Sequence, residues 1–127
     1  MSHFSSIKTK ITDKPQLIEA LELLLYNVEE NKYLKVSGVH SKNHPTVKAE
    51  VAISKDIGFK WNGETYDLVA DKQTWDLDVP VERFIDKITQ QYARLTIHNT
   101  VKELGYQVEE EWEMDDNSIE LTVTNWN

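Results

Sequence analysis

The segment DIGFKWNGETYDLVAD, residues 56–71, contains the strongest turn signal in the chain, at Asn62-Gly63. Asn-Gly favours a type I′ turn because both central residues of that turn have positive φ. Apolar side chains alternate on both sides of the turn, so the segment predicts a β-hairpin with a two-residue loop. The cross-strand pairs expected in that register are Trp61–Glu64, Phe59–Tyr66 and Ile57–Leu68.

The residues before this hairpin predict strands and a helix. Residues 3–11 alternate as a half-buried strand, and residues 33–36 and 47–53 are typical of two more strands. Asp13 suits the N-cap of a helix that has Pro15 in its first turn. Apolar residues then recur at the spacing of a single buried helix face. They are Leu17, Ile18, Ala20, Leu21, Leu24, Leu25 and Val28.

A second helix is expected from Pro80 to Gly105, where the glycine suits the position after the helix end. Its apolar residues do not share one face: Val81, Phe84, Ile85, Ile88, Tyr92 and Leu95 point to one side, whereas Ala93, Ile97, Val101 and Leu104 point to nearly the opposite side. Either the helix breaks near residues 94–96, or another element or another chain covers its C-terminal half from a second direction. Covering by a second copy would make a homo-oligomer through Ile97 and Val101.

The last predicted elements are two strands, residues 106–114 and 118–126, joined by a turn. The full order is β-α-β-β-β-β-α-β-β, which predicts an α+β fold with a mainly antiparallel sheet and both helices packed on one face. We expect a single domain over residues 1–127, a length that can bury a core without metals or disulfides.

The acidic stretch EEEWEMDDN, residues 109–117, lies on the first of these closing strands. Strict alternation places Glu109, Glu111 and Glu113 on an outer face and Val108, Trp112 and Met114 against the interior. The carboxylates could simply be a solvated face that prevents edge-to-edge association. They could also form a docking surface for a partner protein with a basic surface. A metal site is disfavoured, because an extended strand does not wrap its carboxylates around an ion.

Composition excludes several classes of protein. The chain has 127 residues, a formal net charge of −8 and no Cys, so disulfides and thiolate chemistry are absent. Its negative charge and scattered lysines argue against a nucleic-acid partner. No apolar run is long enough for a membrane-spanning helix, and the N-terminus lacks a signal-peptide pattern. We therefore expect a cytoplasmic location or an equivalent compartment.

Candidate catalytic and metal motifs are sparse. No nucleophile elbow or phosphate-binding glycine loop occurs, so no catalytic residue, cofactor or metal site is predicted. His40 and His44 are four residues apart, but they lie in a loop with Gly38 and Pro45 and are interpreted as exposed. Asp67 and Asp71 could share a face, although the simpler interpretation places Asp67 on the outer face and has Asp71 end a strand or cap a turn. Trp75 is interpreted first as a lid on the core and second as an exposed interface residue.

Several segments in the same order suggest a family. They are MSHFSSIKTKI at the start, DIGFKWNGETYDLVAD followed by Trp75, QQYA in the second helix, and GYQVEEE…SIELTVTNW at the end. Across nearly the whole chain these resemble the hypothetical chloroplast reading frame thirty-five family, a domain of unknown function of cyanobacteria, red-algal plastids and cyanophages. The resemblance implies a cyanobacterial cytoplasm or a plastid stroma. It implies no reaction, and a shared site, if one exists, would involve the matching residues His3, Phe4, Asp71 and Trp75.

Two functions are compatible with these observations. The first is a non-enzymatic protein-binding or adaptor domain, in which Glu109, Glu111 and Glu113 contribute the binding surface. The alternative is a small enzyme or a small-ligand-binding domain with its pocket near His3, Asp71 and Trp75.

Overall fold

The computed structural model describes residues 4–35, 46–116 and 118–125 and confirms the predicted α+β fold and element order. The elements are β1 (Ser5–Ile7), α1 (Lys14–Leu23), β2 (Glu29–Lys35), β3 (Thr46–Ala52), β4 (Ile57–Trp61), β5 (Tyr66–Ala70), α2 (Val81–Glu103), β6 (Tyr106–Glu113) and β7 (Ile119–Asn125). Within the described part of the chain, neither helix is long and apolar enough to cross a bilayer.

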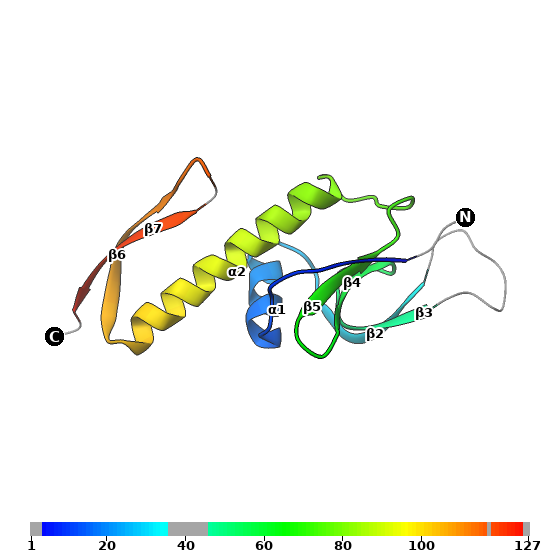
Figure 1. Cartoon of the computed structure of the whole chain (residues 1–127), viewed down its shortest axis with the longest axis horizontal. Helices are drawn as coiled ribbons and strands as arrows, with labels where there is room; N and C mark the ends of the chain where they lie inside the picture. The colour runs from blue at the N-terminus through cyan, green and yellow to red at the C-terminus, as the bar shows by residue number, and fades with distance from the viewer. Residues whose placement is uncertain (1–3, 36–45, 117, 126–127) are drawn as a thin grey trace.

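The first five strands form an antiparallel sheet in the order β1-β5-β4-β3-β2, and both helices pack on one of its faces (Figure 1). The core between the sheet and the helices contains the fully buried Phe59 and Phe84, whose ring centroids are 6.2 Å apart. Burying these large apolar side chains is the main source of the domain's stability. The remaining core residues are Ile11, Leu17, Ala20, Leu21, Val51, Ile57, Leu68, Ala70, Val81 and Ile88.

A smaller apolar cluster lies on the opposite face of this sheet. Leu34, Ala49 and Val69 are buried there, and the half-buried Phe4 packs against them. Gly58 belongs to the same face, and a Cβ at this position would lie 2.7 Å from the Val51 carbonyl oxygen. The sheet is therefore apolar on both faces, although only one face carries helices.

The predicted hairpin forms, but its predicted register is wrong. Each β4 residue pairs two positions further along β5 than expected; the observed pairs include Trp61–Tyr66, Phe59–Leu68 and Ile57–Ala70. The loop is longer because the Asn62 side chain accepts hydrogen bonds from the backbone N–H groups of Glu64 and Thr65, at 2.7 and 2.9 Å. Such side-chain capture of backbone amides competes with the tighter turn. A shift of two residues keeps every side chain on its face, so the apolar pattern could not reveal it.

Helix α1 ends earlier than its apolar stripe predicts. It closes in a Schellman motif, in which Tyr26 N–H donates to Leu21 O and Leu25 N–H donates to Glu22 O. This ending places Leu25 at φ 69° with its side chain in solvent, and the residue is 91% exposed. The prediction that Leu25 is buried is therefore wrong.

Helix α2 is continuous over 23 residues and is covered on two opposite sides. One side packs on the core and on α1; there the Tyr92 hydroxyl accepts the N–H groups of Thr12 and Asp13 at 3.2 and 3.0 Å. The other side faces β6 and β7, which form a separate two-stranded sheet (Figure 1). The helix therefore does not break, and the hairpin covers a polar side that carries Arg94 and His98. Of the second apolar stripe, Ala93 and Leu104 are exposed. Ile97 and Val101 are both half-buried, and a homo-oligomer through them stays a prediction.

Candidate protein-interaction site

The β6–β7 hairpin is held at the C-terminal end of α2 by a glycine. Gly105 has φ +84° and donates its N–H to Lys102 O at 3.0 Å, which ends the helix. A residue with a side chain would be strained at this φ. The chain reverses here, and β6 runs back along the side of α2 that faces away from the five-stranded sheet (Figure 1).

A β-bulge in β6 decides which side chains of the acidic stretch face α2. Val108 pairs with Val123, yet Glu110 pairs with Thr122, so Glu109 is an extra residue in the ladder. Beyond the bulge the alternation is inverted, and Glu111 instead of Trp112 turns toward the helix. Trp112 and Met114 are 47% and 43% exposed. The predicted burial of these two side chains, and the predicted outward direction of Glu111, are therefore wrong.

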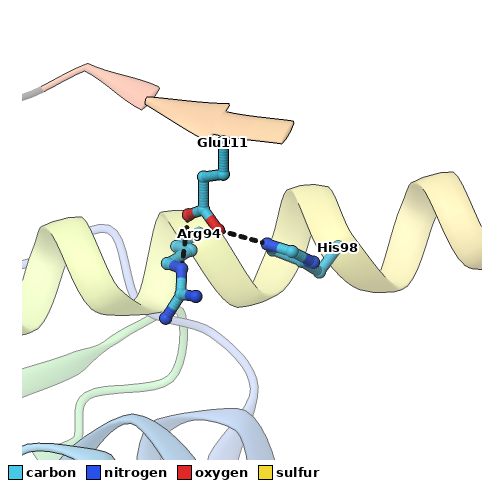
Figure 2. Close-up of polar contacts among 3 residues, drawn as sticks. All are labelled: Arg94, His98 and Glu111. Atoms are coloured by element: carbon cyan, nitrogen blue, oxygen red, sulfur yellow. Dashed lines mark hydrogen bonds and ion pairs between the residues drawn. The ribbon is translucent and has the colours of Figure 1, made fainter. Parts of the chain in front are cut away.

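Glu111 forms the polar contact between the hairpin and α2 (Figure 2). Its Oε1 accepts a hydrogen bond from Arg94 Nε, and its Oε2 lies 3.0 Å from His98 Nε2. Arg94 and His98 are four residues apart and so share a helix face. The hydrogen bond from Arg94 lowers the pKa of Glu111 and, reciprocally, raises the pKa of Arg94. The side chain of Glu111 is only 22% exposed, so the contact is partly shielded from solvent.

The outer face of the hairpin combines an exposed aromatic ring with carboxylates. Trp112 lies directly opposite Glu120 on β7, and Glu110 precedes it by two residues on the same face. All three residues are exposed. A Trp ring attracts a cation over its face, and nearby carboxylates reinforce this attraction. This face can therefore bind an Arg or Lys side chain of another molecule.

The inner side of the hairpin leaves a small cleft of about 290 Å³ against α2. Its walls carry opposite charges, Arg94 on the helix and Glu113 on the strand, together with Ile119 on β7. Glu113 pairs with Ile119 and so belongs to the inner face with Glu111, although its side chain remains exposed. Of the three predicted binding carboxylates, Glu109 and Glu113 are exposed and Glu111 is half-buried.

The other predicted site residues do not come together in one pocket. Phe4 packs on the face of the sheet that lacks helices, whereas Trp75 packs against Phe84 on the helix side, with ring centroids 5.6 Å apart. Trp75 also donates its indole N–H to Val79 O at 2.8 Å, which confirms its interpretation as a lid on the core. His3, His40 and His44 lie outside the described residues.

Asp71 has the turn role that the simpler interpretation gave it. It is 2% exposed, and its Oδ1 accepts the Gln73 N–H at 2.9 Å; among the residues that the structure describes, its Oδ2 has no partner. Asp67 lies at the other end of β5 and binds the side chains of Asn62 and Thr65 at the turn. Asp67 and Asp71 are four positions apart along the strand, about 13 Å between their Cα atoms, and they bind different turns, so they do not form an acid–base pair.

Sequence reasoning missed two features of the polar network. The i, i+4 spacing of Arg94 and His98 was a readable signal for a shared face, but only the bulge brings Glu111 to it. The second is Asp56, a buried carboxylate that accepts hydrogen bonds from Ser54 Oγ at 3.0 Å and Thr74 Oγ1 at 2.9 Å. Over the described ranges, no group of three or more acidic or His side chains could hold a metal ion.

Comparison with known proteins agrees with the resemblance seen in the sequence. Residues 20–122 match the family described as "Protein of unknown function (DUF1257)". The "Uncharacterized protein ycf35" of Pyropia yezoensis is 36% identical over the whole chain and 99% of its own length. The protein of the same name from Guillardia theta is 35% identical over 99% of this chain and 98% of its own length.

These relatives are plastid-encoded proteins, which agrees with the plastid or cyanobacterial context that the resemblance implies. No solved structure matches the chain. The family match covers most of the chain, and the relatives extend over its full length. The chain therefore belongs to the DUF1257 family, whose members include the ycf35 proteins.

Proposed function

We propose that the chain is a non-enzymatic protein-binding domain that takes a basic segment of a partner on the outer face of the β6–β7 hairpin. The observation that supports this most is the exposed Trp112 flanked by Glu110 and Glu120. Trp is the residue type most enriched among interface hot spots, and here it lies beside two carboxylates that attract a cation. This surface uses different carboxylates from those that alternation predicted.

The hairpin is suited to present such a surface because α2 supports it from behind. Glu111 contacts Arg94 and His98, so the inner face is fixed while the outer face stays open. A preorganised surface loses less conformational entropy on binding. The net charge of −8 further favours a cationic partner and speeds its association at low ionic strength.

The alternative function, a small enzyme or a ligand pocket near His3, Asp71 and Trp75, has less support. Trp75 uses its indole N–H within the chain and belongs to the core on the helix side, while Asp71 caps a turn. The unpartnered Oδ2 of Asp71 is the only observation on these described residues that favours a ligand.

A peptide titration tests the proposal. We would measure fluorescence anisotropy of a labelled Arg-rich peptide, and of the same peptide with Gln at the Arg positions, at low and high salt. Only the Arg-rich peptide should bind, and its affinity should be lower at high salt. Trp112→Ala should weaken binding about 30-fold, the effect of an aromatic hot spot, and the double change Glu110→Gln and Glu120→Gln should reduce the salt dependence.

The matched control lies on the other hairpin of the same chain. Trp61 is 40% exposed near the exposed Glu64, so Trp61→Ala and Glu64→Gln remove an equivalent aromatic and carboxylate from another surface. Both control variants should bind the peptide as the unaltered chain does. Equal loss in Trp61→Ala and Trp112→Ala, or equal binding of both peptides, would refute the proposed surface.

A further inference from the structure

The edges of the two sheets differ in how well they are protected against pairing with another strand. Proteins protect an edge by making the strand short, by placing charges on it or by introducing a bulge. Edge strand β1 has only three residues, and edge strand β6 has a bulge at Glu109 and four glutamates. Edge strand β2 carries four charged residues among its seven: Glu29, Glu30, Lys32 and Lys35.

Strand β7 is the least protected of these edges. Its sequence, IELTVTN, is seven residues long and contains one charge, Glu120, and no Pro. The bulge of this hairpin lies on β6, so β7 itself is regular. Within the described residues, no strand pairs with its outer edge. A long, regular edge rich in β-branched residues is the kind that adds another strand.

We propose that β7 pairs in antiparallel fashion with β7 of a second copy of the chain, about a two-fold axis at Thr122. Thr122 is the midpoint of Ile119–Asn125, so this register pairs all seven residues. The resulting cross-strand pairs are Ile119–Asn125, Glu120–Thr124, Leu121–Val123 and Thr122–Thr122. Every pair lies on one face, as an antiparallel ladder requires.

The sequence of β7 is complementary to itself in this register. Glu120 faces Thr124 and not another Glu120, so no like charges lie opposite each other. Leu121 faces Val123, and these half-exposed apolar side chains continue the inner face that also holds Val108. The glutamates of β6 lie on the outer strands, about 14 Å from those of the second copy, a separation larger than the Debye length at physiological salt.

Pairing with a second copy also completes a sheet that is otherwise minimal. Two strands alone are only marginally stable in water, whereas a sheet of four strands with one apolar face can be stable by itself. The dimer would contain the order β6-β7-β7-β6, with α2 of each copy on the inner side. A closed two-fold contact of this kind uses the same edge on both subunits and ends after two copies. The dimer uses the backbone edge of β7, whereas the peptide surface uses the outer side chains of Glu110, Trp112 and Glu120. Trp112→Ala tests the peptide surface and Thr122→Cys tests the edge, so each proposal can fail without the other.

Cysteine cross-linking gives a direct test, because the chain has no Cys of its own. In the proposed dimer, Thr122→Cys brings two cysteines opposite each other, about 5 Å apart at Cα, within the range of a disulfide. Thr124→Cys tests the register, since its two cysteines would be about 13 Å apart. Gln107→Cys, on the exposed β6 position opposite Thr124, controls for random collision.

We expect light scattering of the unaltered chain to show a mass that rises to that of a dimer with concentration. Mild oxidation should convert Thr122→Cys to a covalent dimer at least about tenfold faster than either other cysteine variant, as expected from the disulfide distance limit. A monomeric mass at every concentration, or equal cross-linking of Thr122→Cys and Gln107→Cys, would overturn the proposal.

A charge variant gives an independent readout. Thr122→Lys places a lysine opposite Glu110 within its own hairpin, which favours the hairpin, but places two lysines together at the two-fold axis. We expect this variant to be monomeric with an intact hairpin, as judged by amide chemical shifts. A Thr122→Lys chain that is still dimeric would show that another surface, such as the one at Ile97 and Val101, forms the dimer.

Discussion

Arg94 on α2 donates its Nε–H to Glu111 on β6, so a charged hydrogen bond joins the helix to the hairpin on the side away from the main sheet. The Nε2 atom of His98 is hydrogen-bonded to the second oxygen of the same carboxylate, at 3.0 Å. Because both partners come from one helix face, Glu111 fixes the hairpin in direction as well as in distance. The predictions that follow test this contact first and then the backbone and core that support it.

Replacing the carboxylate should loosen the hairpin without unfolding the domain. In Glu111→Gln the charged pair is lost, and because the side chain of Arg94 is 41% exposed, solvent screening limits the effect to about 1 kcal/mol. Amide hydrogen exchange in β6 and β7 should become about fivefold faster, while exchange in the five-stranded sheet stays unchanged. Glu113→Gln, on the same strand, is the control and should leave both sheets unchanged. Faster exchange throughout the chain would contradict a local role.

The same contact should weaken in acid. The pKa of Glu111 in the folded chain lies below its ordinary value of 4.5, chiefly because of the hydrogen bond from Arg94. A lowered carboxyl pKa stabilises the folded arrangement above the ordinary value, and this contribution is lost as pH falls through the lowered pKa. Chemical shifts of the hairpin amides, followed from about pH 6 to about pH 3, should move in this range. The Glu111→Gln variant should lack this pH-dependent change in chemical shift. If the variant still shows the change, another titrating group causes it.

Replacing Leu25, which follows the end of α1, with glycine should stabilise the folded chain. Leu25 has φ 69° and its side chain lies in solvent, so the strained backbone is not compensated by packing. Leu25→Gly should raise the free energy of unfolding by about 0.5–1 kcal/mol. The control is Leu23→Gly, in the last turn of the helix, which should lower it by about 1 kcal/mol. Urea denaturation measures both, and a destabilised Leu25→Gly would contradict the helix ending described above.

Gly58 and Gly63 should respond to alanine for different reasons. At Gly58 a Cβ would lie 2.7 Å from Val51 O and 2.8 Å from the Ala49 Cβ, so Gly58→Ala forces two strands apart. A loss of about 2–3 kcal/mol is expected from such overpacking. At Gly63 no atom lies within 4 Å of the added Cβ, but φ is +104°, so Gly63→Ala should cost about 1 kcal/mol through backbone strain alone. Thermal denaturation of the two variants should show the larger loss of stability in Gly58→Ala. A larger loss in Gly63→Ala would contradict the close approach at Gly58.

Substitutions of Trp75 and Trp112 should have different effects on the stability of the domain. Trp75 packs on Phe84 and bonds to Val79 O, so Trp75→Ala should lower the free energy of unfolding by about 2–4 kcal/mol. Trp112 is an exposed surface residue, and Trp112→Ala should change stability by less than about 0.5 kcal/mol. Urea denaturation of the two variants makes the comparison. A strongly destabilised Trp112→Ala would mean that this ring supports the fold rather than a partner.

The elements of the fold could be predicted because each carries a local signal. A turn at Asn62-Gly63 and the core-facing apolar stripe of α2 both correspond to observed structure. The β4–β5 register could not be predicted, because an error of two residues leaves the inward and outward pattern unchanged. The end of α1 was missed because Leu24 and Leu25 continue the apolar spacing beyond the last helical residue.

The candidate site was less predictable than the fold. The acidic stretch itself was recognised from its composition, and the exposure of Glu109 and Glu113 agrees with the expected surface. The direction of Trp112 was not recoverable, since an alternating pattern contains no mark of the one-residue bulge at Glu109. Contacts such as Arg94–Glu111 join residues 17 positions apart and depend on that bulge, so spacing alone does not predict them.

The two-sided packing of α2 makes this helix a rigid rod between the core and the hairpin, about 35 Å long at 1.5 Å per residue. Tyr92 is anchored to the start of α1, and Arg94, two positions later on the far side, is anchored to Glu111. Because Glu111 is joined to α2, a rotation of this helix about its long axis carries the hairpin and the Trp112 ring with it. The core and the exposed Trp112 ring are thus connected through one helix.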